Sequence, residues 1–224
     1  MQTPSKLLLI GPTAFRTFRC VWMLQELGVS YEHSTSAPWS DEIKRHHPMG
    51  KVPALVVDGS FSMYESAAIN TFLGDAFRTG NGLVPAAPSL ERAKYDQTIL
   101  FIMTELDSQA LWIHRKHAAL ADVFGDIPEA VSAAKQQFQN ANHALSHQLN
   151  PYLLGDSFSA ADILYVHCLD WAKAIGWQDT WKDDTVVAPR IEPYLNMCHS
   201  RPAYKKVVAI RKQEKERLQR KSKM

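Results

Sequence analysis

The hydrophobic periodicity changes once along the chain, and this change most constrains the fold. Up to residue 78, short apolar runs typical of strands alternate with segments of helical spacing, in the order β-α-β-α-β-β-α. Beyond residue 90, almost every segment has helical spacing. The stretch between, RTGNGLVPAAPS, is rich in Gly, Pro and small residues, which is typical of a linker. We therefore predict an α/β domain over residues 1–79, a linker over 80–90 and an all-helical domain over 91–224.

The elements of the first domain follow from apolar spacing and turn residues. The run KLLLI ends at Gly11-Pro12, and the helix after it ends at Gly28, a plausible C-cap. The segments ALVVD and FSMYE flank Gly59-Ser60, which predicts a hairpin with Asp58-Gly59 at its turn. The predicted elements are strands at 6–10 and 29–36, a helix at 18–28, a short helical turn at 40–48 capped by Ser40, the hairpin at 54–65 and a helix at 65–77.

The second domain is predicted from amphipathic segments. Its central helix follows the sequence SFSAADI, in which Ser159 would cap the helix and Asp162 would complete a capping box. Phe158 and Ile163 stand where a hydrophobic staple sits. From Tyr204 onward the chain has nine Lys or Arg against two Glu, so we expect its end to be a frayed helix or disordered. The predicted helices cover 90–117, 127–149, 160–175, 191–200 and 203–218.

Composition excludes several classes of protein. The formal net charge of +2 gives no reason to expect nucleic-acid binding. No apolar run reaches the ~18 residues that cross a membrane. Three cysteines lie far apart, which indicates reduced thiols in a reducing compartment, here the cytoplasm, and gives no zinc spacing. The adjacent His46 and His47 have no third ligand nearby, so we predict a structural or surface role for them and no bound metal.

The segment HHPMGKVPALVVDGSFSMYESAAI suggests a site for a small zwitterionic peptide. A Val52-Pro53 bond tolerates the cis form, which would turn the main-chain groups of Val52 toward an extended ligand. Glu65-Ser66 lies where a strand gives way to a helix, and amides at a helix start bind carboxylates. Glu65 could pair with an amine, and Lys51 with a second carboxylate.

This segment resembles the glutathione-binding signature of the cytosolic glutathione transferase family. FRCVWMLQELGVSYEH, YLLGDSFSAADILYVHCLDWA and RPAYKKV are similar to further parts of that family in the same order. The resemblance implies a thioredoxin-like first domain, an all-helical second domain and a homodimer. It also implies that glutathione is the co-substrate. Its cysteinyl main chain would bind Val52 beside cis-Pro53, its γ-glutamyl end Glu65 and Ser66, and its glycyl end Lys51.

The group that activates the glutathione thiol is not obvious. Such a thiol has a pKa of about 8.5, and a hydroxyl at the start of the first helix would stabilise its thiolate. The loop reads GPTAFRTFR, and ungapped alignment from ELG puts Ala14 at the family's usual serine, whereas a second alignment puts Phe15 there. Thr13 is our first choice of hydroxyl, and Arg16 would add positive charge. Thr17 is the second hydroxyl, and helix capping is the commoner role at its position.

The electrophilic substrate is expected between the domains, against Phe15, Met103 and Trp112, although a Met and Trp stripe usually belongs to a core. The leading hypothesis is a detoxifying glutathione transferase that conjugates glutathione to a small, apolar electrophile. The alternatives are a glutathione-dependent peroxidase or isomerase on the same scaffold, and a non-enzymatic binding or assembly module.

Overall fold

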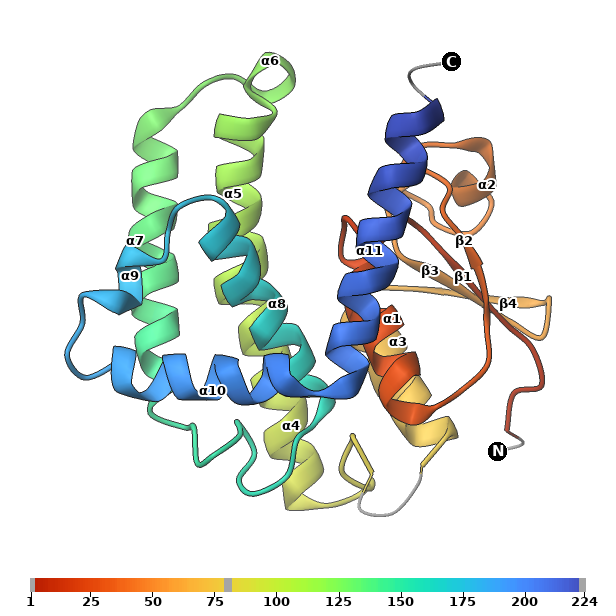
Figure 1. The fold of residues 1–224 in the computed structure, drawn as a ribbon, viewed down its shortest axis with the longest axis horizontal. Helices are drawn as coiled ribbons and strands as arrows, with labels where there is room; N and C mark the ends of the chain where they lie inside the picture. Colours follow the sequence, from red (N-terminus) through yellow and green to blue (C-terminus); the bar gives the residue numbers. More distant parts are fainter. Residues whose placement is uncertain (1–2, 79–81, 222–224) are drawn as a thin grey trace. The chain divides into compact units, whose positions relative to one another are not determined.

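The computed structural model describes residues 3–78 and 82–221, and the chain divides into two compact units (Figure 1). The first unit combines the chain up to Val84 with the chain from His199 onward, and the second runs from Pro85 to Cys198. The last helix therefore belongs to the unit that contains the sheet, although the sequence pattern grouped it with the helical segments. The domain limits at 79 and 91 stay predictions.

The first unit has a thioredoxin-like sheet of four strands. They are β1 (Leu7–Ile10), β2 (Glu32–Ser34), β3 (Ala54–Val57) and β4 (Phe61–Tyr64), in the spatial order β2-β1-β3-β4. Strand β1 runs parallel to β2 and antiparallel to β3, and β3 pairs antiparallel with β4. The predicted hairpin is confirmed, because Asp58 and Gly59 both have positive φ, as its tight turn requires.

Four helices belong to this unit: α1 (Thr17–Leu27), α2 (Asp41–Lys44), α3 (Ser66–Ala76) and α11 (Pro202–Lys221). Gly28 ends α1 in the left-handed conformation, and Ser40 caps α2 by accepting from the Ile43 amide, as predicted. A disordered end was one of the two expectations for residues 211–223, and it was wrong for 211–221, since α11 is helical through Lys221; residues 222 and 223 lie outside the described part of the chain. Unbroken helical propensity explains this, because that stretch holds no Gly or Pro.

Alternation along the strands divides the apolar side chains between the two faces of the sheet. One face packs Ile10, Ala54 and Val56 against Ile43 of α2, with Val52 in the same cluster and Leu8 and Phe15 at its edge. Leu9 and Leu55, which point to the opposite face, are fully buried. Helices α1 and α3 pack against each other, and they contact β1 and β4 respectively. The N-termini of both helices thus lie on a rigid, buried framework.

Helix α11 lies antiparallel along α1 (Figure 1). At one end, Arg201 forms a bidentate ion pair with Glu26, with both N–O distances 2.7 Å. In the middle, the Tyr204 ring packs edge-on against Trp22, with 4.8 Å between the centroids. About two turns further along α11, the Arg211 guanidinium lies 4.9 Å from the centroid of the Phe18 ring. The register of the pair is therefore fixed along its length.

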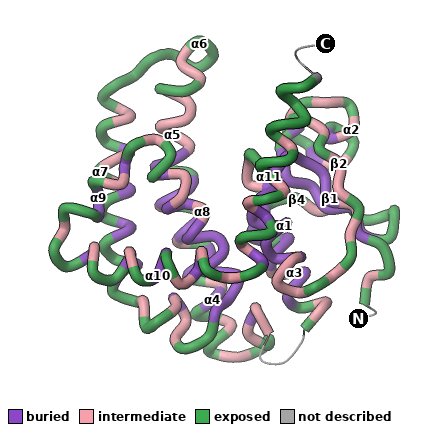
Figure 2. Tube along the Cα trace, viewed as in Figure 1, coloured by how far each residue is buried: buried purple, intermediate pink, exposed green. Residues whose placement is uncertain are grey.

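The second unit is helical in its described part. The capping box is confirmed, because the Ser159 side chain accepts from the Asp162 amide and the Asp162 carboxylate accepts from the Ser159 amide. The helix that it starts, α8, carries a long run of buried residues (Figure 2). No described helix is both long and apolar enough to cross a membrane. The elements are α4 (Leu90–Phe101), η1 (Ile102–Leu111), α5 (Trp112–His114), η2 (Arg115–Ala119), α6 (Ala121–Phe124), α7 (Pro128–Ser146), α8 (Ala160–Ala174), α9 (Asp179–Lys182) and α10 (Ala188–Ser200).

Candidate functional site

The start of α1 meets the start of β3 at Gly11. A Cβ added to Gly11, whose φ is +129°, would lie 2.5 Å from Thr17 Oγ1 and 2.7 Å from Val52 Cβ. Only glycine fits there. Thr17 Oγ1 is fully buried and has no hydrogen-bond partner in the described part of the chain. The capping role considered for Thr17 was therefore wrong: it is the first helical residue, and Arg16 at the N-cap makes no side-chain cap.

Thr13, the first choice of hydroxyl, is held by Glu214 of α11. Its side-chain hydroxyl and its amide both donate to Oε2 of Glu214, over 2.6 and 2.9 Å. Thr13 is 1% exposed, and Ala14 beside it is exposed. A hydroxyl has one proton, so the Thr13 oxygen can only accept from any further partner in this arrangement.

The start of α3 is tied to α1 through a buried arginine. Arg19, fully buried in α1, donates from Nη1 to Oγ of Ser66, the first residue of α3, over 3.2 Å. Glu65 precedes Ser66, is exposed and has a φ of +68°. The buried hydroxyl and the exposed carboxylate therefore lie together at the N-terminus of a helix, whose first amides have no partner inside the helix.

Val52 and Pro53 lie directly before β3, and the bond between them is cis, as predicted. Val52 is almost buried, and the ladder of β3 with its neighbours begins only at Ala54. Lys51 is exposed. Val52, Thr17 and Gly11 are thus adjacent, and the Arg19–Ser66 contact joins the same helix to the start of α3.

The three residues predicted to bind the electrophile lie in different units. Phe15 is partly exposed and packs at the edge of the cluster that contains Val52. Met103 in η1 and Trp112 in α5 are partly exposed in the second unit, and the Lys116 ammonium lies 5.9 Å from the Trp112 ring centroid. Their role in binding stays a prediction.

Two further side chains in this unit, His47 and Cys20, are buried. His47 is buried, its Nδ1 accepts from the Met49 amide, and burial is the main cause that lowers its pKa. Cys20 is buried beside Ser66, and burial raises the pKa of its thiol well above the usual value. Among the described residues, no cluster of His, Cys, Asp and Glu could hold a metal ion.

Sequence patterns assigned no role to Arg19 or Glu214. A signal existed for Arg19, since it interrupts an otherwise apolar stretch from Phe18 to Leu24, where an arginine must find a buried partner. No sequence signal links Glu214 to Thr13, because 201 positions separate them.

A known protein family matches the part of the chain that holds this candidate site. The model of the glutathione S-transferase N-terminal domain matches residues 16–76, which include α1, the Val52-Pro53 bond, Glu65 and α3. Residues 16–76 therefore match the N-terminal domain of the glutathione S-transferases.

The known proteins that this chain resembles differ in length. Glutathione S-transferase hmp2 from Hypomyces subiculosus is 27% identical over 76% of this chain and 84% of its own length. Elongation factor 1-gamma from Artemia salina is 28% identical over 72% of this chain, which covers only 39% of that protein. The crystal structure of glutathione transferase URE2P8 from Phanerochaete chrysosporium, solved with oxidised glutathione, has a TM-score of 0.79, 22% identity and coverage of 94% of this chain and 97% of that one. This last likeness shows a shared fold.

Proposed function

We propose that this chain is a member of the cytosolic glutathione S-transferase family, and that it binds glutathione and conjugates its thiol to a small, apolar electrophile. The single observation that carries the proposal is the Arg19–Ser66 hydrogen bond, which joins the start of α3 to the helix that begins beside Val52. One end of the sheet thereby offers a helix N-terminus for a carboxylate, an exposed acid for an ammonium and free main-chain groups for a peptide.

Each part of glutathione has a proposed partner. The γ-glutamyl carboxylate takes the first amides of α3 and the Ser66 hydroxyl, and its ammonium takes Glu65. The cysteinyl main chain pairs with Val52 beside Pro53, and the glycyl carboxylate takes Lys51.

The thiol then lies toward the start of α1, where positive partial charge favours its anion. We assign the helping hydroxyl to Thr17, because its oxygen lies next to Val52 and has no other partner in the described chain, and the positive charge to Arg16. The thiol gives its proton to solvent, and the thiolate sulfur attacks the electrophilic carbon. A C–S bond forms, and the leaving group departs with the electron pair of its bond, for example as chloride.

The cellular compartment, the contacts with the second substrate, the oligomeric state and the biological role are also proposals. Each described cysteine is buried and outside any disulfide, which supports a reducing compartment such as the cytoplasm. We propose that Phe15, Met103 and Trp112 contact the apolar electrophile, that the protein acts as a homodimer, and that its role is detoxification.

A second candidate is a binding or assembly module without turnover. It is favoured by Ala14 at the position that resembles the family's serine, together with the engagement of the Thr13 proton by Glu214.

The test is a turnover assay with a chlorinated nitroaromatic and, separately, an organic hydroperoxide, each with and without glutathione. Glutathione-dependent release of chloride supports conjugation, and reduction of the hydroperoxide alone supports the peroxidase alternative. Glutathione binding without either reaction supports the non-enzymatic candidate. If conjugation occurs, Thr17→Val should lower kcat/KM by about 10²-fold, as the loss of a donor to a reacting anion does, and Thr17→Ser should keep it.

A further inference from the structure

Glu214 satisfies both polar donors of Thr13 with a single carboxylate oxygen. The hydroxyl lies 2.6 Å and the amide 2.9 Å from Oε2. Because Thr13 is almost completely buried, no solvent can replace this partner. The main chain just before α1 is therefore held from a helix near the end of the chain.

His33 of β2 adds a second tie at the same place. Its Nε2 lies within hydrogen-bond distance, 2.8 Å, of the Gly11 carbonyl oxygen, and its Nδ1 lies 3.7 Å from Oε1 of Glu214. Gly11 lies so close to Thr17 and Val52 that a Cβ at this position would collide with both. Residues 11 and 13 are thus fixed from two elements outside their own loop.

The rest of α11 keeps Glu214 at that position. The ion pair of Arg201 with Glu26 and the packing of Arg211 on Phe18 set the register of the helix against α1. Around Glu214, the neighbouring residues of α11 from 211 to 220 are exposed, whereas Glu214 itself is largely covered. One carboxylate on this otherwise solvated stretch points into the fold.

We propose that Glu214 is the positioning residue of the thiol-activating segment 11–16, and that Thr13 is its anchor and not the donor to the thiolate. The inference rests on the proposed function, because it assigns a role toward glutathione. Glu214 acts through geometry: its oxygen holds Thr13, Thr13 fixes the segment, and the segment sets the start of α1 beside Val52.

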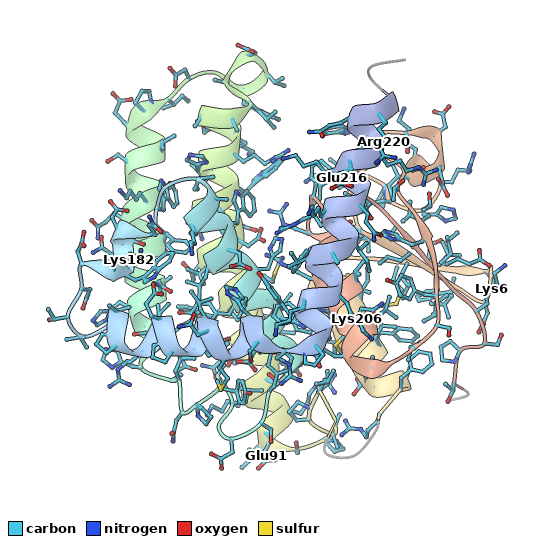
Figure 3. All side chains as sticks on the ribbon, viewed as in Figure 1. Lys6, Glu91, Lys182, Lys206, Glu216 and Arg220 are labelled. Atoms are coloured by element: carbon cyan, nitrogen blue, oxygen red, sulfur yellow. The ribbon has the colours of Figure 1, made fainter. Side chains whose placement is uncertain are left out.

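The test compares Glu214→Ala with Glu214→Gln. The amide oxygen of glutamine can take the place of Oε2 and accept from both Thr13 groups without a charge, whereas alanine cannot. We expect KM for glutathione to rise about tenfold in Glu214→Ala, with kcat within about threefold, and to stay within about twofold of wild type in Glu214→Gln. Glu216→Ala, at an exposed position of the same helix (labelled in Figure 3), is the matched control and should leave both constants unchanged.

A double-mutant cycle tests the anchor. Thr13→Val should raise KM for glutathione. Thr13→Val combined with Glu214→Ala should raise KM no further than Glu214→Ala alone, because loss of the carboxylate already removes the bond to the Thr13 hydroxyl along with the bond to the amide. Additive effects, an unchanged KM in Glu214→Ala, or equal losses in Glu214→Ala and Glu214→Gln would each overturn the proposal.

Amide hydrogen exchange separates this proposal from the proposed function. If the wild type neither binds nor turns over glutathione, the proposed function fails, and exchange still decides whether Glu214 holds the segment. The Thr13 amide should be protected in wild type and Glu214→Gln, and should exchange at least tenfold faster in Glu214→Ala. Equal protection in all three proteins would contradict the positioning role.

Discussion

Arg19 and Ser66, 47 positions apart in the chain, are joined by a buried hydrogen bond of 3.2 Å between Nη1 and Oγ. The bond fixes the start of α3 against the side of α1, so the two helix ends proposed to receive glutathione are parts of one rigid assembly. A buried arginine is costly unless it is paired, which makes this contact a strong determinant of the local structure.

Replacement of Ser66 by alanine tests that contact. The Arg19 guanidinium loses one buried partner, so we expect the free energy of unfolding to fall by about 1–3 kcal/mol. KM for glutathione should rise about tenfold or more, because the proposed carboxylate site also loses a hydroxyl. Urea unfolding and steady-state kinetics measure the two effects. Ser60→Ala, in the exposed hairpin turn, is the control, and an equal result for both variants would argue against the role of Ser66.

Gly11→Ala tests the close approach of the α1 start to Val52. The added Cβ would meet Thr17 and Val52 at 2.7 Å or less, at a φ that L residues rarely adopt, so we expect a loss of roughly 2–4 kcal/mol in unfolding free energy. Gly155→Ala has a similar φ of +109° and open space around the Cβ, so it isolates the backbone cost. Equal losses for the two variants would mean that the contact itself contributes nothing.

Asp162 makes more contacts than its capping box alone. Its carboxylate accepts from the Ser159 amide and hydroxyl, from the Leu153 amide and from the Tyr194 hydroxyl. The loss of about 0.5–2 kcal/mol expected from capping is therefore too small, and we predict about 3–5 kcal/mol for Asp162→Ala. Chemical denaturation would measure it. A loss below about 1 kcal/mol would contradict these contacts. Ser159→Ala should cost less than Asp162→Ala, because it removes only the hydroxyl and the other three donors, the main-chain amide of residue 159 among them, keep their acceptor.

Asp58 gives a pH dependence of stability. Hydrogen bonds from the Lys6 amide and from Ser5 lower the pKa of its carboxyl below the ordinary value of 3.8. A lowered pKa in the folded state means that the contribution to stability is present above pH 3.8 and is lost as the pH falls through the folded-state pKa.

Asp58→Asn removes this titration while asparagine still tolerates the positive φ. The difference in unfolding free energy between wild type and Asp58→Asn should therefore shrink on acidification below pH 3.8. A difference that stays constant with pH would show that the carboxylate is not held as described.

Local patterns predicted much of the fold, because its elements carry their own signals. The segments ALVVD and FSMYE, with the Asp58-Gly59 turn between them, predicted the hairpin. Ser159 and Asp162 predicted the start of α8. The contacts of Thr13 and Ser66 could not be predicted, since each depends on a partner that only tertiary packing brings near. The same packing explains the error over Thr17: a threonine at a helix start usually caps, but here its hydroxyl is enclosed beside Val52.

The most direct test of the account is a calorimetric titration of the wild-type chain and Ser66→Ala with glutathione, with Ser60→Ala as reference. We predict saturable binding at one site per chain for wild type and Ser60→Ala, and about tenfold or more weaker binding for Ser66→Ala. No heat of binding to the wild type, or equal affinity in all three proteins, would contradict a glutathione site at the start of α3.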